Sequence, residues 1–126
     1  MNAIKHLRNN NIVENYFETL KNNPSKRIEE IFRITAKSSA PMFYVTFENA
    51  RRFISLLMRG KRLPVTNSNK RKMYMEIYRR YRERVKDSDA RYKYLILEDI
   101  IKEPAPSFYL NEETIRQIVY TTLRKP

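Results

Sequence analysis

The chain has 126 residues with 26 Lys and Arg against 14 Asp and Glu, which gives a formal net charge of +12 at pH 7. Such a charge calls for a polyanionic partner, nucleic acid first and an anionic membrane surface second. The lack of Cys and the single His, His6, exclude disulfides, thiolate metal sites and a histidine cluster, while the single Gly, Gly60, excludes glycine-rich phosphate loops.

Periodic apolar residues predict helices along nearly the whole chain, beginning with a helix over residues 5–21. Residues 22–25, Asn-Asn-Pro-Ser, break this first helix, and Ser25 is the predicted N-cap of the second. The second helix ends before Pro41, because the residue that precedes a proline avoids helical geometry. The apolar residues of these two helices are Ile12, Val13, Tyr16, Phe17 and Leu20, then Ile28, Ile31 and Phe32.

Residues 42–45 are predicted to be extended and to lead into a third helix over residues 46–58. Thr46 caps this helix, Glu48 lies favourably in its first turn, and Gly60 ends it. A connection over residues 61–69 follows. The inward stripe of the third helix consists of Phe47, Ala50, Phe53, Ile54 and Leu57.

The second half of the chain repeats this plan. A helix is predicted over residues 70–86, residues 87–89 break it and cap the next helix, and residues 103–106 end that helix. Asn111 caps the last helix, over residues 111–124. The apolar positions of the three helices are Met73, Ile77, Tyr81 and Val85, then Tyr92, Tyr94, Leu95, Ile96, Leu97, Ile100 and Ile101, then Ile115, Ile118, Val119 and Leu123.

The chain contains an internal repeat with an offset of 65 residues. Residues 40–46, Ala-Pro-Met-Phe-Tyr-Val-Thr, are echoed by residues 105–111, Ala-Pro-Ser-Phe-Tyr-Leu-Asn, and flanking positions match at the same offset. We therefore predict an all-α fold of two tandem trihelical, helix-turn-helix-like repeats, packed as one compact unit because so short a repeat buries little core alone. The predicted domains are residues 1–60 and 70–126, joined by the basic connection 61–69.

Each repeat carries an aromatic pair, Phe43-Tyr44 or Phe108-Tyr109, where a loop must cross the core. We interpret these pairs as anchors that set the angle between the second and third helices. The alternative is that exposed rings among basic residues stack on nucleic-acid bases.

The residues that catalysis needs are scarce in this chain. The only His lies near the N-terminus, so no Ser has a His base, and the paired carboxylates are sequence neighbours that point to different helix faces. A Tyr nucleophile for DNA strand transfer needs an Arg/His constellation around the phosphate, which one His does not supply. We expect no enzymatic activity, no cofactor and no metal.

Positive charge is concentrated between residues 59 and 86, where 11 Lys and Arg accompany only two acids, Glu76 and Glu83. One interpretation is a solvated helix face with i, i+4 ion pairs. Two acids do not neutralise so many bases, so we favour contacts to phosphates, which set affinity and salt dependence rather than sequence preference. The predicted phosphate contacts are Arg59, Lys61, Arg62, Lys70, Arg71, Lys72, Arg79, Arg80, Arg82 and Lys86.

Sequence readout is expected from the third helix of each repeat, because that helix enters the major groove in trihelical DNA-binding units. Asn and Gln pair with adenine, and Arg pairs with guanine. The outward residues that fit these roles are Asn49, Arg51 and Arg52 in the first repeat and Thr114, Arg116 and Gln117 in the second.

Residues 92–120, a helix followed by Phe-Tyr-Leu-Asn-Glu-Glu and a helix with Ile115 and Ile118, resemble helix-turn-helix proteins of the Trp-repressor-like class. They are similar in particular to small basic proteins of bacterial mobile elements. The resemblance covers about 30 residues in each repeat and implies DNA binding. The turns are longer than the three to four residues of a standard helix-turn-helix and lack Gly.

These observations predict a DNA-binding protein, a regulator or accessory factor of a phage or mobile element, which prefers duplex DNA to RNA. The alternative is a structural, virion or assembly protein that uses aromatic loops and helices for contacts with other proteins. No apolar run is long enough for a membrane span, so we expect no membrane partner and a cytoplasmic or virion-associated location. A homo-oligomer or a larger assembly fits either prediction.

Overall fold

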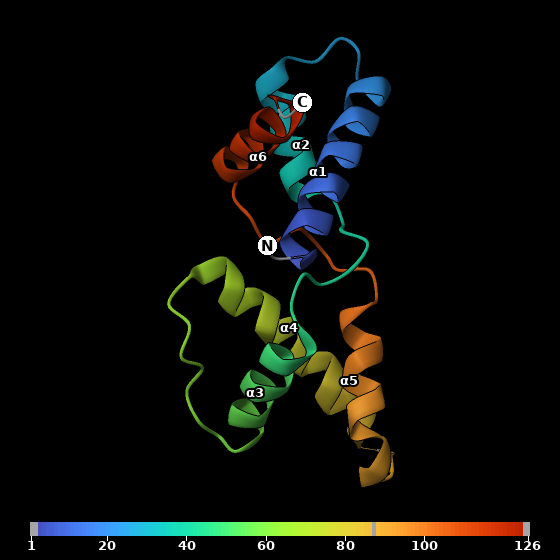
Figure 1. The fold of residues 1–126 in the computed structure, drawn as a ribbon, viewed down its shortest axis with the longest axis vertical. Coiled ribbons are helices and arrows are strands. Elements are labelled where there is room, and N and C mark those ends of the chain that lie inside the picture. The colour runs from blue at the N-terminus through green and yellow to red at the C-terminus, as the bar shows by residue number, and fades with distance from the viewer. Residues whose placement is uncertain (1–2, 87, 125–126) are drawn as a thin grey trace. The chain divides into compact units, whose positions relative to one another are not determined.

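The computed structural model describes residues 3–86 and 88–124, and this part of the chain is all-α, as predicted. It contains six α-helices and one short 3-10 helix, and the described residues form no strand (Figure 1). The helices are α1 (Ala3–Asn22), α2 (Ile28–Lys37), α3 (Phe47–Met58), α4 (Ser68–Val85), α5 (Lys93–Ile101) and α6 (Glu112–Arg124), with the 3-10 helix η1 (Ala90–Tyr92) before α5.

Three of the predicted helix-end signals are confirmed. The Thr46 hydroxyl accepts a hydrogen bond from the Asn49 amide at 3.1 Å, and the Asn111 side chain accepts one from the Thr114 amide at 2.8 Å. Both are N-caps in the usual geometry. Gly60 ends α3 in the left-handed region with φ 73, and its amide donates to the Leu57 carbonyl while the Lys61 amide donates to Leu56, which is a Schellman C-cap.

Other local predictions are wrong. Ser25 does not cap α2, because that helix begins at Ile28 after Arg27, which makes no capping bond. Asn67 caps α4 through the Lys70 amide, so α4 begins inside the predicted connection. In the break before α5, Asp87 lies outside the described residues. Several residues of the predicted apolar stripes are exposed, namely Phe17, Ile28, Tyr92, Tyr94, Leu95 and Leu123.

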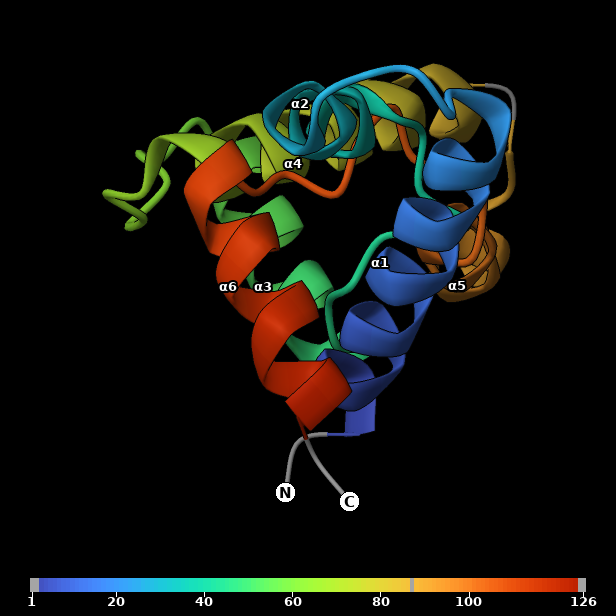
Figure 2. The ribbon, with the colours of Figure 1, turned by 90° about the horizontal axis from the view of Figure 1, so that it is seen from above.

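The helices form two compact units that do not follow the predicted domain boundaries. Unit 1 combines the described residues of 1–44 with those of 104–126, and its helices α1, α2 and α6 all pack on one another. Figure 2 shows these three helices on three sides of the unit. Unit 2 is the continuous segment Val45–Glu103, in which α3, α4 and α5 pack on one another. Each unit is thus trihelical, but it takes its third helix from the other repeat.

Repeat-equivalent residues occupy the cores of the two units, which explains why the third helices are interchangeable. At the offset of 65, buried residues of unit 1 match buried residues of unit 2, so the docking surface for a third helix is similar in both. The apolar pattern of each third helix, α3 or α6, therefore fits the first two helices of either repeat. The matched buried pairs are Ile12 and Ile77, Phe32 and Leu97, Thr35 and Ile100, Ala50 and Ile115, and Ile54 and Val119.

The two chain segments that leave α2 and α5 meet within unit 1. The amide of Ala40 donates to the carbonyl of Ala105 at 2.9 Å and the reverse bond has the same length, which forms an isolated antiparallel bridge between equivalent positions. This pairing holds the segment after α2 extended, so the chain passes on to α3 in unit 2 and does not turn back onto α2.

The repeated aromatic pairs stack reciprocally beside this bridge. Phe43 stacks on Tyr109 with ring centroids 6.2 Å apart, and Tyr44 stacks on Phe108 at 5.9 Å. Both Phe rings are buried, and the Tyr44 hydroxyl accepts a hydrogen bond from Asn11 at 2.7 Å. The two buried Phe rings therefore anchor the crossing of the two repeats. That they set the angle between the second and third helices of one repeat stays a prediction.

Candidate nucleic-acid interface

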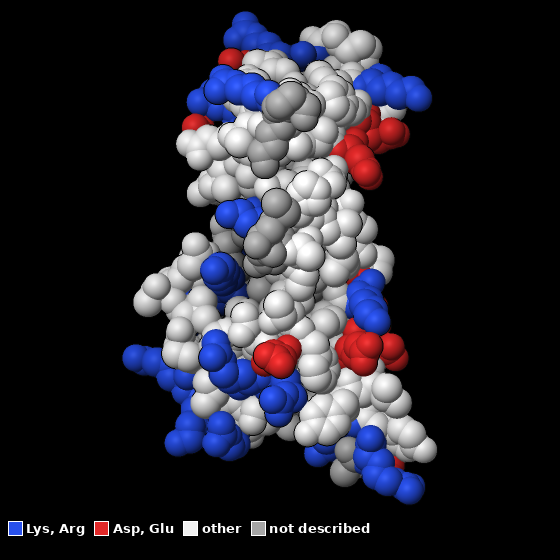
Figure 3. All heavy atoms as spheres, in the orientation of Figure 1, with Lys and Arg blue, Asp and Glu red and all other residues white. Residues whose placement is uncertain are grey.

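Positive charge is unequally divided between the two units. Unit 2 contains 16 Lys and Arg against 8 Asp and Glu, a formal charge of +8, whereas the segments of unit 1 contain 10 against 6, a charge of +4. Figure 3 shows Lys and Arg side chains gathered on the part of the surface where α3, α4 and their connection lie. The exchange of third helices places α3 in the same unit as the basic helix α4.

The outward face of α4 carries a line of cations. Met73, Tyr74 and Ile77 are buried and fix the inward face of the helix. Residues spaced by three or four positions share one face, and the residues at 72, 75, 79, 82 and 86 follow this spacing and are all exposed. At 1.5 Å per residue this stripe is about 21 Å long. We call it the α4 stripe, and it consists of Lys72, Met75, Arg79, Arg82 and Lys86.

A separate flank of α4 is neutralised by carboxylates. The Arg80 guanidinium contacts Glu76 at 2.7 Å and Glu103 at 3.2 Å, and the Arg80 side chain is only 18% exposed. Arg84 donates to Glu103 at 2.8 Å. Arg80 therefore fastens α4 to the end of α5, and its contact with phosphate stays a prediction. The count of acids near α4 in the sequence missed Glu103, which lies 23 residues away from Arg80.

The two carboxylates of this flank are held in their charged form. Hydrogen bonds from Arg79 lower the pKa of Glu76 below its ordinary value of 4.5, although partial burial opposes the shift. Hydrogen bonds from Arg84 lower the pKa of Glu103 in the same way. The flank stays neutral on balance at neutral pH, and the α4 stripe keeps its positive charge.

Arg71 is a second predicted phosphate contact with a structural partner. Its guanidinium donates to the carbonyl of Leu63 at 3.1 Å and to that of Val65 at 2.8 Å. Leu63 is itself buried, at 3% exposure. Arg71 and Leu63 together fasten the connection between α3 and α4 to the rest of unit 2.

The remaining predicted phosphate contacts are exposed side chains of unit 2. Arg79 and Lys86 each have a carboxylate one turn away, Glu76 at 2.8 Å and Glu83 at 3.7 Å. Arg82 lies over the Tyr78 ring, 5.5 Å from its centroid. The others have no carboxylate of a described residue within 4.0 Å, and they are Arg59, Lys61, Arg62, Lys70 and Lys72.

The six candidate base contacts are divided between the two units. On α3 in unit 2, Asn49, Arg51 and Arg52 are exposed, and the Arg52 guanidinium lies 4.7 Å from the centroid of the Phe53 ring. On α6 in unit 1, Thr114 is half-buried, Gln117 is exposed, and Arg116 pairs with Glu113 at 3.2 Å. Only the set on α3 shares a unit with the α4 stripe.

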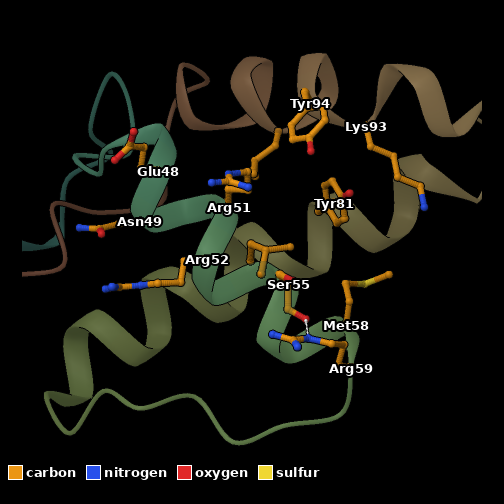
Figure 4. Close-up of a pocket in the computed structure, with 12 residues that line it drawn as sticks. Glu48, Asn49, Arg51, Arg52, Ser55, Met58, Arg59, Tyr81, Lys93 and Tyr94 are labelled. Atoms are coloured by element: carbon orange, nitrogen blue, oxygen red, sulfur yellow. Dashed lines mark hydrogen bonds between the residues drawn. The ribbon is translucent and has the colours of Figure 1, made fainter.

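Unit 2 also contains a hollow of about 610 Å³ between α3, α4 and α5, which the sequence did not indicate. Figure 4 shows its labelled side chains, with Arg51 from α3, Tyr81 from α4, and Lys93 and Tyr94 from α5. Tyr81 and Tyr94 were predicted as core positions. The hollow depends on α3 docking beside α4 and α5, and this exchange has no local signal in the sequence.

Comparison with known proteins finds no match to this chain among family models, curated proteins or solved structures. Among the described residues, no three His, Asp or Glu side chains are grouped so that they can hold a metal ion. The helices described in the structure include none with the length and apolar character that a membrane crossing requires.

Proposed function

We propose that this protein is a non-enzymatic nucleic-acid-binding protein, that duplex DNA is its preferred partner, and that unit 2 is the part that binds. The observation that carries the proposal is the α4 stripe, a line of four cations and one Met on the outward face of a helix. It lies in the unit with twice the net charge of the other, next in sequence to the cations of the connection.

The chemistry of the stripe suits a phosphate backbone. Duplex DNA carries about one negative charge per 1.7 Å of its axis, so a line of cations about 21 Å long meets several phosphates along one strand or across a groove. Each neutralised phosphate releases counterions, and this release supplies affinity without reading sequence. Exposed cations with no carboxylate nearby, such as Lys61, Arg62 and Lys72, contribute most, because they break no ion pair on binding.

Base contacts, in this proposal, come from α3. Its exposed Asn49 and Arg51 are residue types that pair with adenine and guanine edges. The α6 residues Thr114, Arg116 and Gln117 lie in unit 1 and are a second, separate set. The resemblance of residues 92–120 to small basic proteins of mobile elements supports a role as a regulator or accessory factor of a phage or mobile element.

The proposal is tested by the salt dependence of binding to a fully paired duplex of random sequence. A protein with six or more phosphate contacts gives a plot of log affinity against log salt with a slope of about −5 or steeper. Fluorescence anisotropy between roughly 50 and 200 mM salt covers the range over which such a slope is large. A flat plot, or no binding at the lowest salt, would show that the basic face is only a solvated surface.

A structural or assembly role is a second candidate, and one observation favours it. Tyr92, Tyr94 and Leu95 are large apolar side chains that are 52%, 60% and 56% exposed at the start of α5. Exposed apolar groups of this kind mark protein interaction sites when they are adjacent. Light scattering on the nucleic-acid-free protein separates the candidates, since a large defined assembly favours this role and a monomer or dimer favours DNA binding.

A further inference from the structure

We propose that the hollow in unit 2 holds one unpaired nucleotide of a nucleic-acid strand, with the base against Tyr81 and Tyr94 and the phosphate near Arg51 and Lys93. This inference rests on the proposed function, since it concerns a strand that the basic face of the same unit has bound. It adds a class of ligand, an unstacked nucleotide at a junction or overhang. A surface that binds only the duplex backbone would bind DNA with and without such a nucleotide equally well.

The size and the walls of the hollow fit one nucleotide. Its volume of about 610 Å³ lies within the usual range of sites for small organic ligands and is far too small for a duplex. Ile54 and Leu97, both nearly fully buried, form an apolar lining from α3 and α5. Tyr81 is half-buried, burial raises the pKa of its hydroxyl, and its ring adds an uncharged wall from α4.

Two aromatic rings from different helices reach this hollow. Tyr81 belongs to α4, and Tyr94 belongs to α5, where it is 60% exposed. Exposed or half-exposed tyrosines among cations are the usual platform for unpaired bases, because every base has a flat face that stacks on an aromatic ring whatever its identity. The Tyr94 ring also lies 6.2 Å from the Phe47 ring, centroid to centroid, so its position beside α3 is held.

The charge around the hollow favours an anion. Its lining includes Arg51, Arg59 and Lys93, and no carboxylate of a described residue lies within 4.0 Å of these three cations. Among the described residues, Glu48 is the one acid in the lining. Arg59 donates through Nε to the Ser55 carbonyl at 3.3 Å. A phosphate group attached to the stacked base therefore finds cations at the same site that no carboxylate of a described residue neutralises.

The hollow is continuous in sequence with the predicted phosphate contacts. Arg59 lines it and also begins the run of cations that continues through Lys61 and Arg62 in the connection. A strand that leaves the hollow past Arg59 meets these side chains next. A free mononucleotide shares the same chemistry, a flat base with a phosphate, but it makes no use of this neighbouring run.

The experiment uses the full chain and three probes, each with the fluorescent base 2-aminopurine. The first is a fully paired duplex, the second is the same duplex with a short single-stranded extension that contains the probe base, and the third is the free nucleotide. We expect the extended duplex to bind about tenfold more tightly than the paired one, which is the low end of the effect of stacking one base. The probe fluorescence should fall on binding only in the extension.

Two variants at exposed positions remove this preference. Tyr94→Ala and Lys93→Gln should reduce the tenfold ratio to about threefold or less while the paired duplex keeps its affinity, because neither residue belongs to the α4 stripe. Tyr92→Ala is the matched control, since Tyr92 is 52% exposed two residues away and does not line the hollow. It should leave the ratio unchanged.

The outcomes separate this inference from the proposed function. If the paired duplex binds with a steep salt slope but the extension adds nothing, or if Tyr94→Ala keeps the tenfold preference, the inference about the hollow is wrong and the proposed function stands. If the free nucleotide binds as tightly as the extended duplex, the site serves free nucleotides and the inference is overturned. If no probe binds at low salt, both proposals fail.

Discussion

Unit 1 and unit 2 are built from equivalent helices, yet they carry different side chains on equivalent outward faces. At the repeat offset of 65, the α4 stripe of unit 2 corresponds on α1 to Leu7, Asn10, Glu14, Phe17 and Lys21. Seven Lys and Arg against two Glu lie on α4, whereas three lie against two on α1. The buried positions match and the outward ones do not, so the duplication accounts for the fold and the difference between the units accounts for the proposed binding.

The two units also differ because each takes its third helix from the other repeat. A tandem arrangement would have placed α3 with the nearly neutral helix α1. The observed arrangement places α3, with Arg51 and Arg52, beside the basic helix α4 in one continuous segment of chain. The exchange therefore places the candidate base contacts of the first repeat in the same unit as the α4 stripe, which belongs to the second repeat.

We expect the largest difference between the units from two matched core substitutions, one in each unit, which should destabilise different sets of helices. Ile12 in unit 1 and Ile77 in unit 2 are repeat-equivalent and both fully buried. Ile12→Ala and Ile77→Ala should each lower the free energy of unfolding by about 2–5 kcal/mol, because each leaves a cavity. Hydrogen exchange resolved by residue should show Ile77→Ala losing protection first in α3, α4 and α5, with DNA binding reduced, and Ile12→Ala losing it first in α1, α2 and α6. Equal loss in all six helices after either substitution would mean that the units unfold as one.

A smaller effect is expected at the two helix caps. Thr46→Ala removes the cap of α3 in unit 2, and Asn111→Ala removes that of α6 in unit 1. Each should cost about 1 kcal/mol, since one helix N–H loses its acceptor. Chemical denaturation measures the cost, and Thr46→Ser and Asn111→Asp, which keep an acceptor, are the controls. A cost near zero in both variants would contradict the capping geometry.

Acid should destabilise unit 2 through Glu76 and Glu103. Arginine hydrogen bonds lower the pKa of both carboxyls below 4.5 in the folded protein, so their contribution to stability is present above that pH and is lost as the pH falls through the lower folded values. The effect is modest because both groups are partly exposed. Thermal melting should show stability flat between about pH 7 and 5 and falling below about 4.5. The Glu76→Gln/Glu103→Gln double variant should melt lower at pH 7 and lose part of the acid dependence, whereas an unchanged acid slope would show that other groups cause it.

Local sequence signals predicted the helices but not their partners. Thr46, Asn111 and Gly60 act through hydrogen bonds and backbone angles within a few residues, so a pattern in one short window reveals them. The all-α class follows in the same way from apolar spacing. Which helices α3 and α6 pack against depends on docking between distant segments. Because the two repeats have similar apolar patterns, the sequence does not distinguish packing within one repeat from packing across the two repeats.

In the candidate interface, too, the sequence reveals local features but not contacts between distant residues. The concentration of charge around α4 is visible in composition, but the assignment of Arg80 to Glu103 and of Arg71 to the carbonyls of Leu63 and Val65 is not. Phosphate binding by Arg80 or Arg71 would compete with these contacts. The hollow with Tyr81 and Tyr94 was missed because both rings fit an apolar stripe, and only their exposure in the folded unit distinguishes them.

Two variants with the same net charge test whether unit 2 binds DNA through the α4 stripe. One carries Lys72→Gln, Arg82→Gln and Lys86→Gln on the stripe, and the other carries three changes at exposed residues of unit 1, Lys21→Gln, Arg27→Gln and Lys37→Gln. Both lower the formal charge from +12 to +9.

The measurement is the salt slope of binding to a fully paired duplex for the two variants and the parent chain. Each phosphate contact that is lost reduces the slope by about one, so the stripe variant should lose about three units of slope, and the unit 1 variant should keep the parent slope within about one. Equal losses in the two variants would contradict the account, because they would show that overall charge, and not the α4 stripe, attracts the DNA.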